Sequence, residues 1–201
     1  MKSPKTLIAD DDQRLDLKPL PRSFYERDPR LVAPELLYKI LLRGDGRAGR
    51  IIEVEAYCGE EDPAAHTFNG PTPRNRTMFG PGGHMYVYFT YGMHWCANTV
   101  CGLEGQGWGV LIRAVTPIAG IERMRPLRPR ARSDRDLASG PARLTQAFGI
   151  DGSFDGADLV RNDRGVSVMS DGTMPPTTPR AGPRIGISRG KEFPWRWRCP
   201  L

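Results

Sequence analysis

The sequence predicts a single α+β domain in which a curved, mainly antiparallel β-sheet carries helices on its outside and one β-hairpin protrudes. Three observations support this fold class. The length of 201 residues is sufficient for one domain with its own core. The 23 glycines and 19 prolines favour many turns and short strands. Segments with the alternating pattern of strands are interspersed with a few segments that have helical spacing.

The first quarter of the chain is predicted to hold a tail, a helix and a strand. Residues 1–18 are polar and charged, and we expect a flexible tail there, so that the domain proper covers 19–201. Apolar residues at helical spacing predict a helix that starts at Pro34, because proline is tolerated at the first helical position. These residues are Leu36, Leu37, Ile40 and Leu41. The alternation in RIIEVEAY, residues 50–57, predicts a strand.

The next expected feature is a long, turn-rich loop over 58–83, and long loops in compact domains are often functional. A hairpin over 84–100 follows, with its turn at Tyr91 and Gly92, because glycine readily adopts positive φ. The remaining expected elements are a strand over 107–117, a helix from 118 that Pro126 breaks, a helix over 139–149 and a short last strand.

The charge balance is basic, with a net charge of +6 and a pI near 9.4. This surplus suggests an acidic partner, most simply nucleic acid, whose phosphates release counterions when cationic side chains bind. The alternative is a protein that is only soluble and basic. The stretch Arg125–Arg135 contains five arginines and forms either a solvated loop or a phosphate-contacting patch.

The cysteines and the start of the chain exclude several classes of protein. Cys58, Cys96, Cys101 and Cys199 form no C-x-x-C pair with which His66 could complete a zinc site, so we expect no metal and no cofactor. No secretory signal and no apolar run approaching about 18 residues is present, so we expect no membrane partner. We therefore expect a monomer in a reducing compartment, cytoplasmic and nucleoid-associated if bacterial, nuclear if eukaryotic.

One face of the 50–57 strand carries Glu53, Glu55 and Tyr57. Glutamate is depleted in strands, and two carboxylates on one face repel each other. Partial burial would raise the pKa of one of them, as a general base requires. The alternative is an exposed face whose carboxylates form ion pairs with Arg50 or Arg113.

Aromatic residues gather on the following hairpin. Tyr86 and Tyr88 share a face, and Tyr91 should lie at the tip, where an aromatic ring is poorly buried. Exposed rings at a basic site stack on nucleic-acid bases or wedge between them. The alternative is that Tyr86 and Tyr88 are core residues with satisfied hydroxyls. The PRNR segment before the hairpin adds three candidate phosphate contacts: Arg74, Asn75 and Arg76.

The string IIEVEAYCGEEDPAAH…GPTPRNRTMFGPGGHMYVYFTYGMHWCAN closely resembles the alkyladenine (3-methyladenine) DNA glycosylase family, the methylpurine glycosylases. The motifs LPRSFYERDPRLVAPELL, VLIRAVTP, LASGPARLTQAFGI and PRIGI also match in order, so the resemblance covers roughly Leu20 to Trp197. Two departures are Tyr38, where glycine is common in the family, and the ending WRWRCPL. We expect altered local packing at the first and a frayed or altered strand at the second.

The resemblance implies a role for each motif residue. Glu55 is implied to be the general base that activates water, and Arg113 the residue that helps to hold that water. The aromatic walls of the base pocket are implied to be Tyr57, His66 and Tyr88. Asn98 is implied to discriminate against the amino group of guanine. The hairpin tip that fills the gap left by the extruded nucleotide is Tyr91, Gly92, Met93 and His94.

The implied activity is DNA repair. Damaged purines are flipped out of double-stranded DNA and their N-glycosidic bond is hydrolysed, which leaves an abasic site. The choice among alkyladenine, alkylguanine and deaminated purines stays open. No lysine occurs from Ile51 to Arg113, so we expect a monofunctional glycosylase rather than a Schiff-base lyase. The alternatives are a catalytically impaired DNA- or lesion-binding module of the same fold, and an unrelated hydrolase of small molecules.

Overall fold

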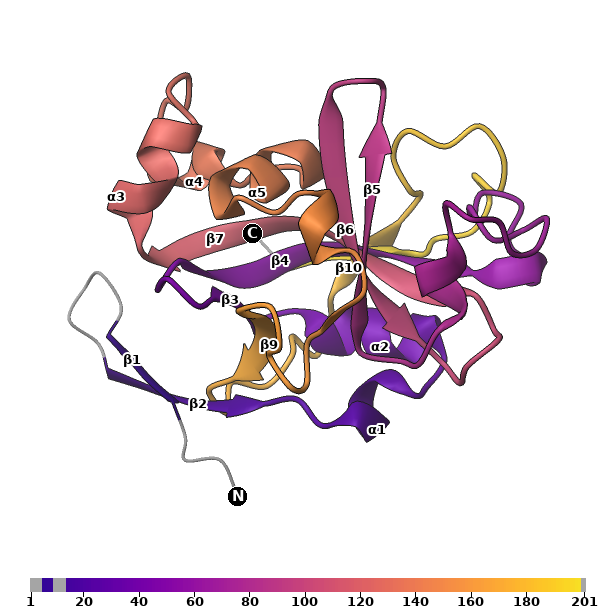
Figure 1. Cartoon of the computed structure of the whole chain (residues 1–201), viewed down its shortest axis with the longest axis horizontal. Helices are drawn as coiled ribbons and strands as arrows, with labels where there is room; N and C mark the ends of the chain where they lie inside the picture. Colours follow the sequence, from indigo (N-terminus) through magenta and orange to yellow (C-terminus); the bar gives the residue numbers. More distant parts are fainter. Residues whose placement is uncertain (1–4, 9–13, 200–201) are drawn as a thin grey trace.

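The computed structural model describes residues 5–8 and 14–199, and its open, antiparallel sheet confirms the α+β class (Figure 1). Neighbouring strands follow the order β1-β2-β9-β3-β4-β7-β6-β5-β8, and β11 joins β10 to β4. The strands are β1 (Lys5–Ile8), β2 (Arg14–Pro19), β3 (Ile40–Arg43), β4 (Ala48–Cys58), β5 (His84–Thr90), β6 (His94–Cys101), β7 (Trp108–Ala119), β8 (Ala157–Asp158), β9 (Val166–Ser170), β10 (Arg180–Gly182) and β11 (Arg196–Arg198).

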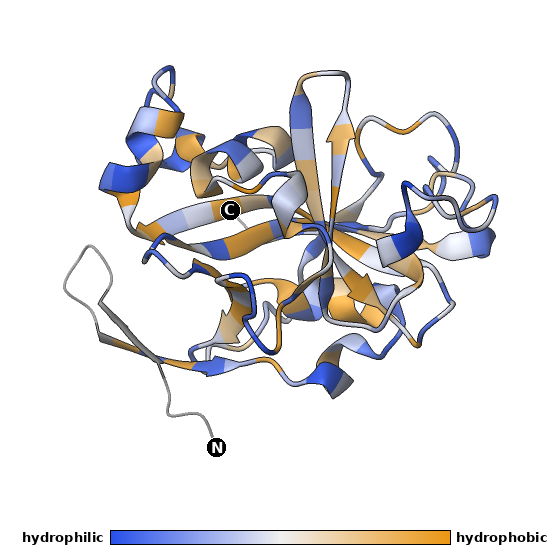
Figure 2. Ribbon diagram, viewed as in Figure 1, coloured by the Kyte–Doolittle hydropathy of each residue, from blue (hydrophilic) through white to orange (hydrophobic). Residues whose placement is uncertain are grey.

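Short helices cover the sheet and close the core. The α-helices are α1 (Arg22–Tyr25), α2 (Pro29–Leu36), α3 (Ile121–Met124), α4 (Asp134–Leu137) and α5 (Pro141–Phe148). The 3₁₀ turns are η1 (Gly59–Glu61), η2 (Arg76–Phe79), η3 (Arg125–Leu127) and η4 (Gly152–Phe154). Helix α2 packs on β4 and β7, and α5 packs on β6 and β7. Figure 2 shows the apolar stretches of these strands in orange, interrupted by more polar residues. Within the described ranges, no helix has the length and apolar character needed to cross a membrane.

The helix expected from Pro34 onward is wrong. Helix α2 begins at Pro29, where the Asp28 carboxylate accepts a hydrogen bond from the Arg30 backbone N–H, and it ends at Leu36. Tyr38 then takes a φ of 67°, which breaks the helix and explains why a glycine would fit this position. The following apolar run is the buried strand β3. Short apolar runs suit either a buried strand or a helix, so spacing alone could not separate them.

The expected flexible tail over 1–18 is partly overturned. Strand β2 pairs with β9 through Lys18 and Ser170, and the side chain of Leu17 is fully buried. Strand β2 is therefore held on the domain by its pairing with β9 and by the burial of Leu17. The expectation for residues 1–4 and 9–13 lies outside the described residues.

The other main elements agree with the sequence patterns. Strands β5 and β6 form a hairpin that projects away from the sheet (Figure 1). Its turn uses positive φ at Tyr91 (52°) and Gly92 (66°), which suits the twist of a tight hairpin. Helix α5 starts at Pro141 and ends before Gly149, whose φ is 59°. The last strand, β11, is formed and pairs with β4, so it is not frayed.

An ion pair joins β4 to the segment that follows β9, and it gives the first prediction. Arg50 Nη2 lies 2.7 Å from Asp171 Oδ2, and Arg50 Nη1 donates to the Tyr38 carbonyl at 2.9 Å. Burial alone would raise the pKa of Asp171, but hydrogen bonds from Arg50 and Thr173 outweigh it and lower this pKa to about 2. The unfolded carboxyl titrates near about 3.9, so its stabilising effect exists above that pH and disappears as pH falls through about 2.

We expect Asp171→Asn to lower the free energy of unfolding by about 1 kcal/mol at pH 7, a value that allows for solvent screening of this partly buried pair. The difference from wild type should vanish near pH 2. Urea unfolding of both proteins at several pH values measures it. An equal loss at pH 7 and at pH 2 would contradict the ion-pair explanation.

Candidate active site

The centre of the site is the carboxylate of Glu55, which is completely buried in β4. Its Oε1 accepts a hydrogen bond from the Ile185 backbone N–H at 2.8 Å, and its Oε2 accepts one from the Tyr57 hydroxyl at 2.9 Å. Arg113 Nη1 lies 3.2 Å from Oε2. A buried carboxylate is very costly unless it is paired and hydrogen-bonded, and both oxygens meet this requirement.

Glu53 supports this arrangement from the same strand. Arg113 Nε lies 3.2 Å from Glu53 Oε1, and Arg196 Nη1 lies 2.9 Å from the same oxygen. The antiparallel register of β4 with β7 places Arg113 between the two carboxylates. Two glutamates and two arginines thus balance each other. The sequence left two alternatives for these carboxylates: an ion pair with Arg113 on an exposed face, or burial suited to a general base. The structure has both the ion pair and the burial, because Glu55 is buried and lies 3.2 Å from Arg113.

A cavity of about 300 Å³ lies in front of these groups, and its lining includes the aromatic rings of Tyr57, His66, Tyr86, Tyr88 and Tyr91. The His66 and Tyr88 rings meet edge to face, with centroids 4.5 Å apart and an angle of 75°. Tyr86 stacks on Tyr88 with centroids 5.4 Å apart and also lines the cavity, so it is both a core and a pocket residue. The structure therefore brings together the predicted walls Tyr57, His66 and Tyr88 and adds Tyr86.

Glu55 itself is not exposed to this cavity. Its three partners, Tyr57, Arg113 and Ile185, are lining residues. The carboxylate therefore lies directly behind this part of the wall, within 2.8–3.2 Å of three lining residues. No sequence pattern signals the Ile185 contact, because every residue except proline carries a backbone N–H donor.

The aromatic walls are electrically neutral near pH 7. Burial, and next the Glu55 charge, raise the pKa of Tyr57, which therefore keeps its proton. Burial also raises the pKa of Tyr86 to about 12 and that of Tyr88 further. Burial, with a smaller contribution from Arg74, lowers the pKa of His66 below its ordinary 6.5. The pocket thus offers uncharged rings, which attract a cationic ring rather than repel it.

A second buried ion pair, Asp62 with Arg184, fixes the pocket from behind, and both side chains are fully buried. Arg184 Nη2 donates to Asp62 Oδ1 at 2.7 Å, and Nη1 donates to the Ala56 carbonyl at 2.9 Å. The guanidinium carbon lies 4.7 Å from the centroid of the Tyr57 ring. Since Ile185 is the next residue, this pair positions two of the three groups that hold Glu55. Sequence reasoning missed it, because the partners are 122 residues apart.

Asn98 lines the cavity, and the residues of the hairpin tip are exposed beside it. The Asn98 amide is buried in β6, donates to the Tyr86 carbonyl at 3.3 Å and lines the cavity. Tyr91 and Met93 are 77% and 67% exposed at the tip, and Gly92 and His94 are exposed beside them. Tyr91 also lines the cavity, so the exposed ring stands at its mouth.

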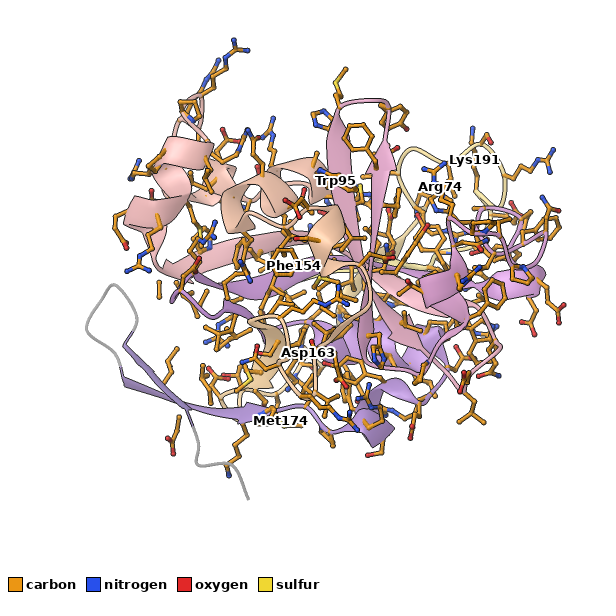
Figure 3. All side chains as sticks on the ribbon, in the orientation of Figure 1. Arg74, Trp95, Phe154, Asp163, Met174 and Lys191 are labelled. Carbon is orange, nitrogen blue, oxygen red and sulfur yellow. The ribbon has the colours of Figure 1, made fainter. Side chains whose placement is uncertain are left out.

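The PRNR segment divides into two kinds of residue. Arg74 and Arg76 are exposed, and Arg74 donates to the Phe89 carbonyl at 2.7 Å, which places it beside the hairpin (Figure 3). Asn75 is buried. Its Nδ2 donates to the His66 carbonyl at 2.8 Å, and its Oδ1 accepts from the Thr72 N–H at 2.6 Å. Its amide is therefore occupied inside the protein, and the expected phosphate contact by Asn75 is corrected to a loop-bracing role.

Residues 23–200 match the family model described as methylpurine-DNA glycosylase (MPG). A Burkholderia lata protein with the provisional name 3-methyladenine DNA glycosylase is 61% identical over 181 residues, covering 90% of this chain and 87% of the relative. Proteins with the same provisional name from Koribacter versatilis and Streptomyces avermitilis are 47% and 48% identical, each over 90% of this chain and 89% and 88% of the relative. These similarities indicate a DNA-repair hydrolase of the DNA glycosylase class. The chain belongs to the methylpurine-DNA glycosylase family.

The Asp62–Arg184 pair gives a prediction about stability. Asp62→Asn leaves a buried guanidinium without its counter-charge, and we expect a loss of about 3–5 kcal/mol in the free energy of unfolding. Thermal or urea unfolding measures it. The matched control is Asp134→Asn, because Asp134 forms an ion pair with Arg125 in which both side chains are about half exposed. The control should lose less than about 1 kcal/mol. Equal effects at the two positions would show that burial of the pair is unimportant.

Proposed function

We propose that this protein hydrolyses the N-glycosidic bond of alkylated purines in double-stranded DNA, with Glu55 as the general base. The observation that carries the proposal is the fully buried carboxylate, held by Arg113, Tyr57 and the Ile185 N–H, at the back of a cavity with aromatic walls. The names of the family and of its members support the same substrate class.

The proposed substrate enters the cavity as an extrahelical base. A base inside a duplex cannot reach a pocket, so the nucleotide must rotate out at a cost of a few kcal/mol. The Tyr91 ring offsets part of this cost when it fills the vacated stack. Stacking against His66 and Tyr88 contributes roughly 1–3 kcal/mol per ring. Because the walls are neutral, a positively charged alkylated purine gains a further cation–π attraction that an unmodified purine lacks.

The proposed chemistry is a displacement at the sugar. The bond between C1′ and the purine nitrogen breaks, and its electron pair leaves with the alkylated base, which thereby loses its positive charge. A water oxygen bonds to C1′ while Glu55 accepts the water proton. The products are the free base and an abasic sugar with a hydroxyl at C1′. Arg113 keeps the Glu55 carboxylate in place and, as a cavity-lining cation, holds the incoming water.

The proposal is restricted to a monofunctional enzyme. A lyase step needs an amine that attacks C1′, and the cavity lining contains no lysine within the part of the chain that the structure describes. Deaminated purines stay a prediction. They are neutral and leave less readily, so they need a proton donor, and the Tyr57 hydroxyl already donates to Glu55. The monomeric state and the nucleoid or nuclear location also stay predictions.

Glu55→Gln tests the assigned base directly. The amide keeps the shape of the carboxylate but cannot accept a proton, so we expect base release to slow by at least about 100-fold while duplex binding is retained. The measurement is single-turnover release from a duplex with one alkylated purine, followed by alkali cleavage at abasic sites.

Glu53→Gln is the matched control for this experiment, because it alters the neighbouring carboxylate and should cost less than about tenfold. An unchanged rate in Glu55→Gln would overturn the assignment. A wild-type protein that binds the lesion duplex without releasing the base would instead support a lesion-binding module of the same fold.

Tyr91→Ala tests the exposed ring at the cavity mouth. The ring has little contact with the folded chain, so we expect unchanged thermal stability, whereas base release should fall by about 10- to 100-fold because the wedge is lost. Leu103→Ala is the control, since Leu103 is also highly exposed but lies in a loop outside the cavity lining. A Tyr91 variant as active as the Leu103 variant would contradict the wedge.

A further inference from the structure

The segment from Arg125 to Arg143 has a surplus of positive charge that is large compared with the net charge of the chain. It contains six arginines and two aspartates, a surplus of four positive charges, whereas the whole chain has a net charge of +6. Part of this segment surrounds a hollow that we call the arginine groove, and it is lined by Arg128, Arg130, Arg132, Asp136 and Arg143. A concave surface with one predominant charge attracts the opposite charge more strongly than a flat one.

The frame of the groove is fixed by internal hydrogen bonds. Arg128 donates to the Leu137 carbonyl at 3.2 Å and to the Gln146 side chain at 3.0 Å. Arg143 forms an ion pair with Asp136, which also accepts the Arg132 backbone N–H at 3.3 Å. The Asp136 carboxylate is therefore already engaged by the Arg143 guanidinium and the Arg132 backbone N–H. Its single negative charge does not neutralise the four arginines that line the groove.

Two arginines of the groove remain available for a ligand. Arg130 and Arg132 are exposed, and across the described residues neither guanidinium forms a hydrogen bond or ion pair with another side chain. A polar surface without aromatic rings, which offers free guanidiniums on a braced frame, suits phosphate oxygens better than bases. Contacts of this kind position a nucleic acid and do not read its sequence.

The first turn of α5 connects the groove to the candidate active site. Pro141 lines the aromatic cavity, Ala142 lines a hollow shared with Met93 and His94 of the hairpin, and Arg143 lines the arginine groove. Pro141 and Arg143 are two residues apart in the same helical turn, so the aromatic cavity and the arginine groove are adjacent. The loop after α3 and the hairpin tip also project toward the same side of the molecule (Figure 1).

We infer that the arginine groove binds backbone phosphates of the DNA strand next to the extruded nucleotide, on the α3–α5 side of the hairpin. The inference rests on the proposed function, since it needs a duplex seated over the aromatic cavity. It assigns a role to the Arg125–Arg135 stretch that the sequence left open between a solvated loop and a phosphate-contacting patch. Arg74 lies on the other side of the hairpin, so the wedge stands between two cationic supports.

The test is the double variant Arg130→Ala/Arg132→Ala, whose side chains hold no part of the fold together. Fluorescence anisotropy with a duplex that carries one abasic-site analogue gives Kd at several salt concentrations. Loss of two phosphate contacts should weaken binding by on the order of 10- to 100-fold at 0.1 M salt and reduce the slope of log K against log salt by about 1.8. Base release at saturating enzyme should stay within about twofold of wild type, because the cavity is unchanged.

Two controls separate charge from structure. Arg130→Lys/Arg132→Lys keeps both charges and should restore most of the affinity and of the salt slope. Lys18→Ala removes an exposed cation on β2, at the edge of the sheet opposite the hairpin (Figure 1), and should bind as wild type does.

The outcomes distinguish this inference from the proposed function. Suppose that the wild-type protein releases alkylated purines and that the alanine variant has an unchanged Kd and salt slope. This outcome overturns the inference about the arginine groove and leaves the proposed function intact. A lysine variant as weak as the alanine variant also overturns the inference about the groove, because a charge-driven contact survives that exchange. A wild-type protein that neither binds the duplex nor releases a base overturns the proposed function itself.

Discussion

The withdrawal of the Glu55 carboxylate from water is the constraint on which the rest of the site depends. A bare charge at that depth would be very unfavourable, so the fold must supply donors to both oxygens. The register of β4 with β7 brings Arg113, the alternation along β4 brings Tyr57, and the segment after β10 brings the Ile185 N–H. Three segments distant in sequence are therefore tied together by one anion. The proposed general base and the tertiary structure around it therefore depend on each other.

The buried Asp62–Arg184 pair extends this constraint to the loops. It crosses from the turn after β4 to the segment that carries Ile185, and its guanidinium packs on the Tyr57 ring. A hydrophobic pair of similar size would cost less desolvation, but it could not donate to the Ala56 carbonyl or orient Ile185. The hydrogen bonds of an ion pair fix direction as well as distance. We interpret the Asp62–Arg184 pair as a positioning element. Its desolvation penalty is offset by hydrogen bonds that hold the groups around Glu55 in place.

Patterns within one segment were predictable from the sequence, and contacts between segments were not. Alternation revealed β4, the β5–β6 hairpin and β7, and the proline and glycine at its ends revealed α5. The same rules failed after Leu36, because an apolar run buried on both sides has no period, and the left-handed turn at Tyr38 is hidden by a non-glycine residue. The resemblance named Glu55 and the aromatic walls. Asp62, Arg184 and the inward-facing amide of Asn75 required coordinates, since burial of a polar residue depends on partners far along the chain.

The distribution of charge separates two tasks that a basic protein must perform on the same nucleic acid. Phosphate groups are attracted by cationic side chains, whereas a positively charged base would be repelled by a cation placed against the face of its ring. Burial keeps His66 neutral and the buried tyrosines protonated, so the aromatic walls of the cavity carry no charge. Among the described residues that line the cavity, Arg113 is a cation, and it is balanced by Glu53 and Glu55. Unpaired guanidiniums such as Arg130 and Arg132 lie instead outside the cavity, where water screens them from its interior. Under the proposed function, the net charge would act on the backbone of the DNA, and selectivity for the base would depend on the neutral rings.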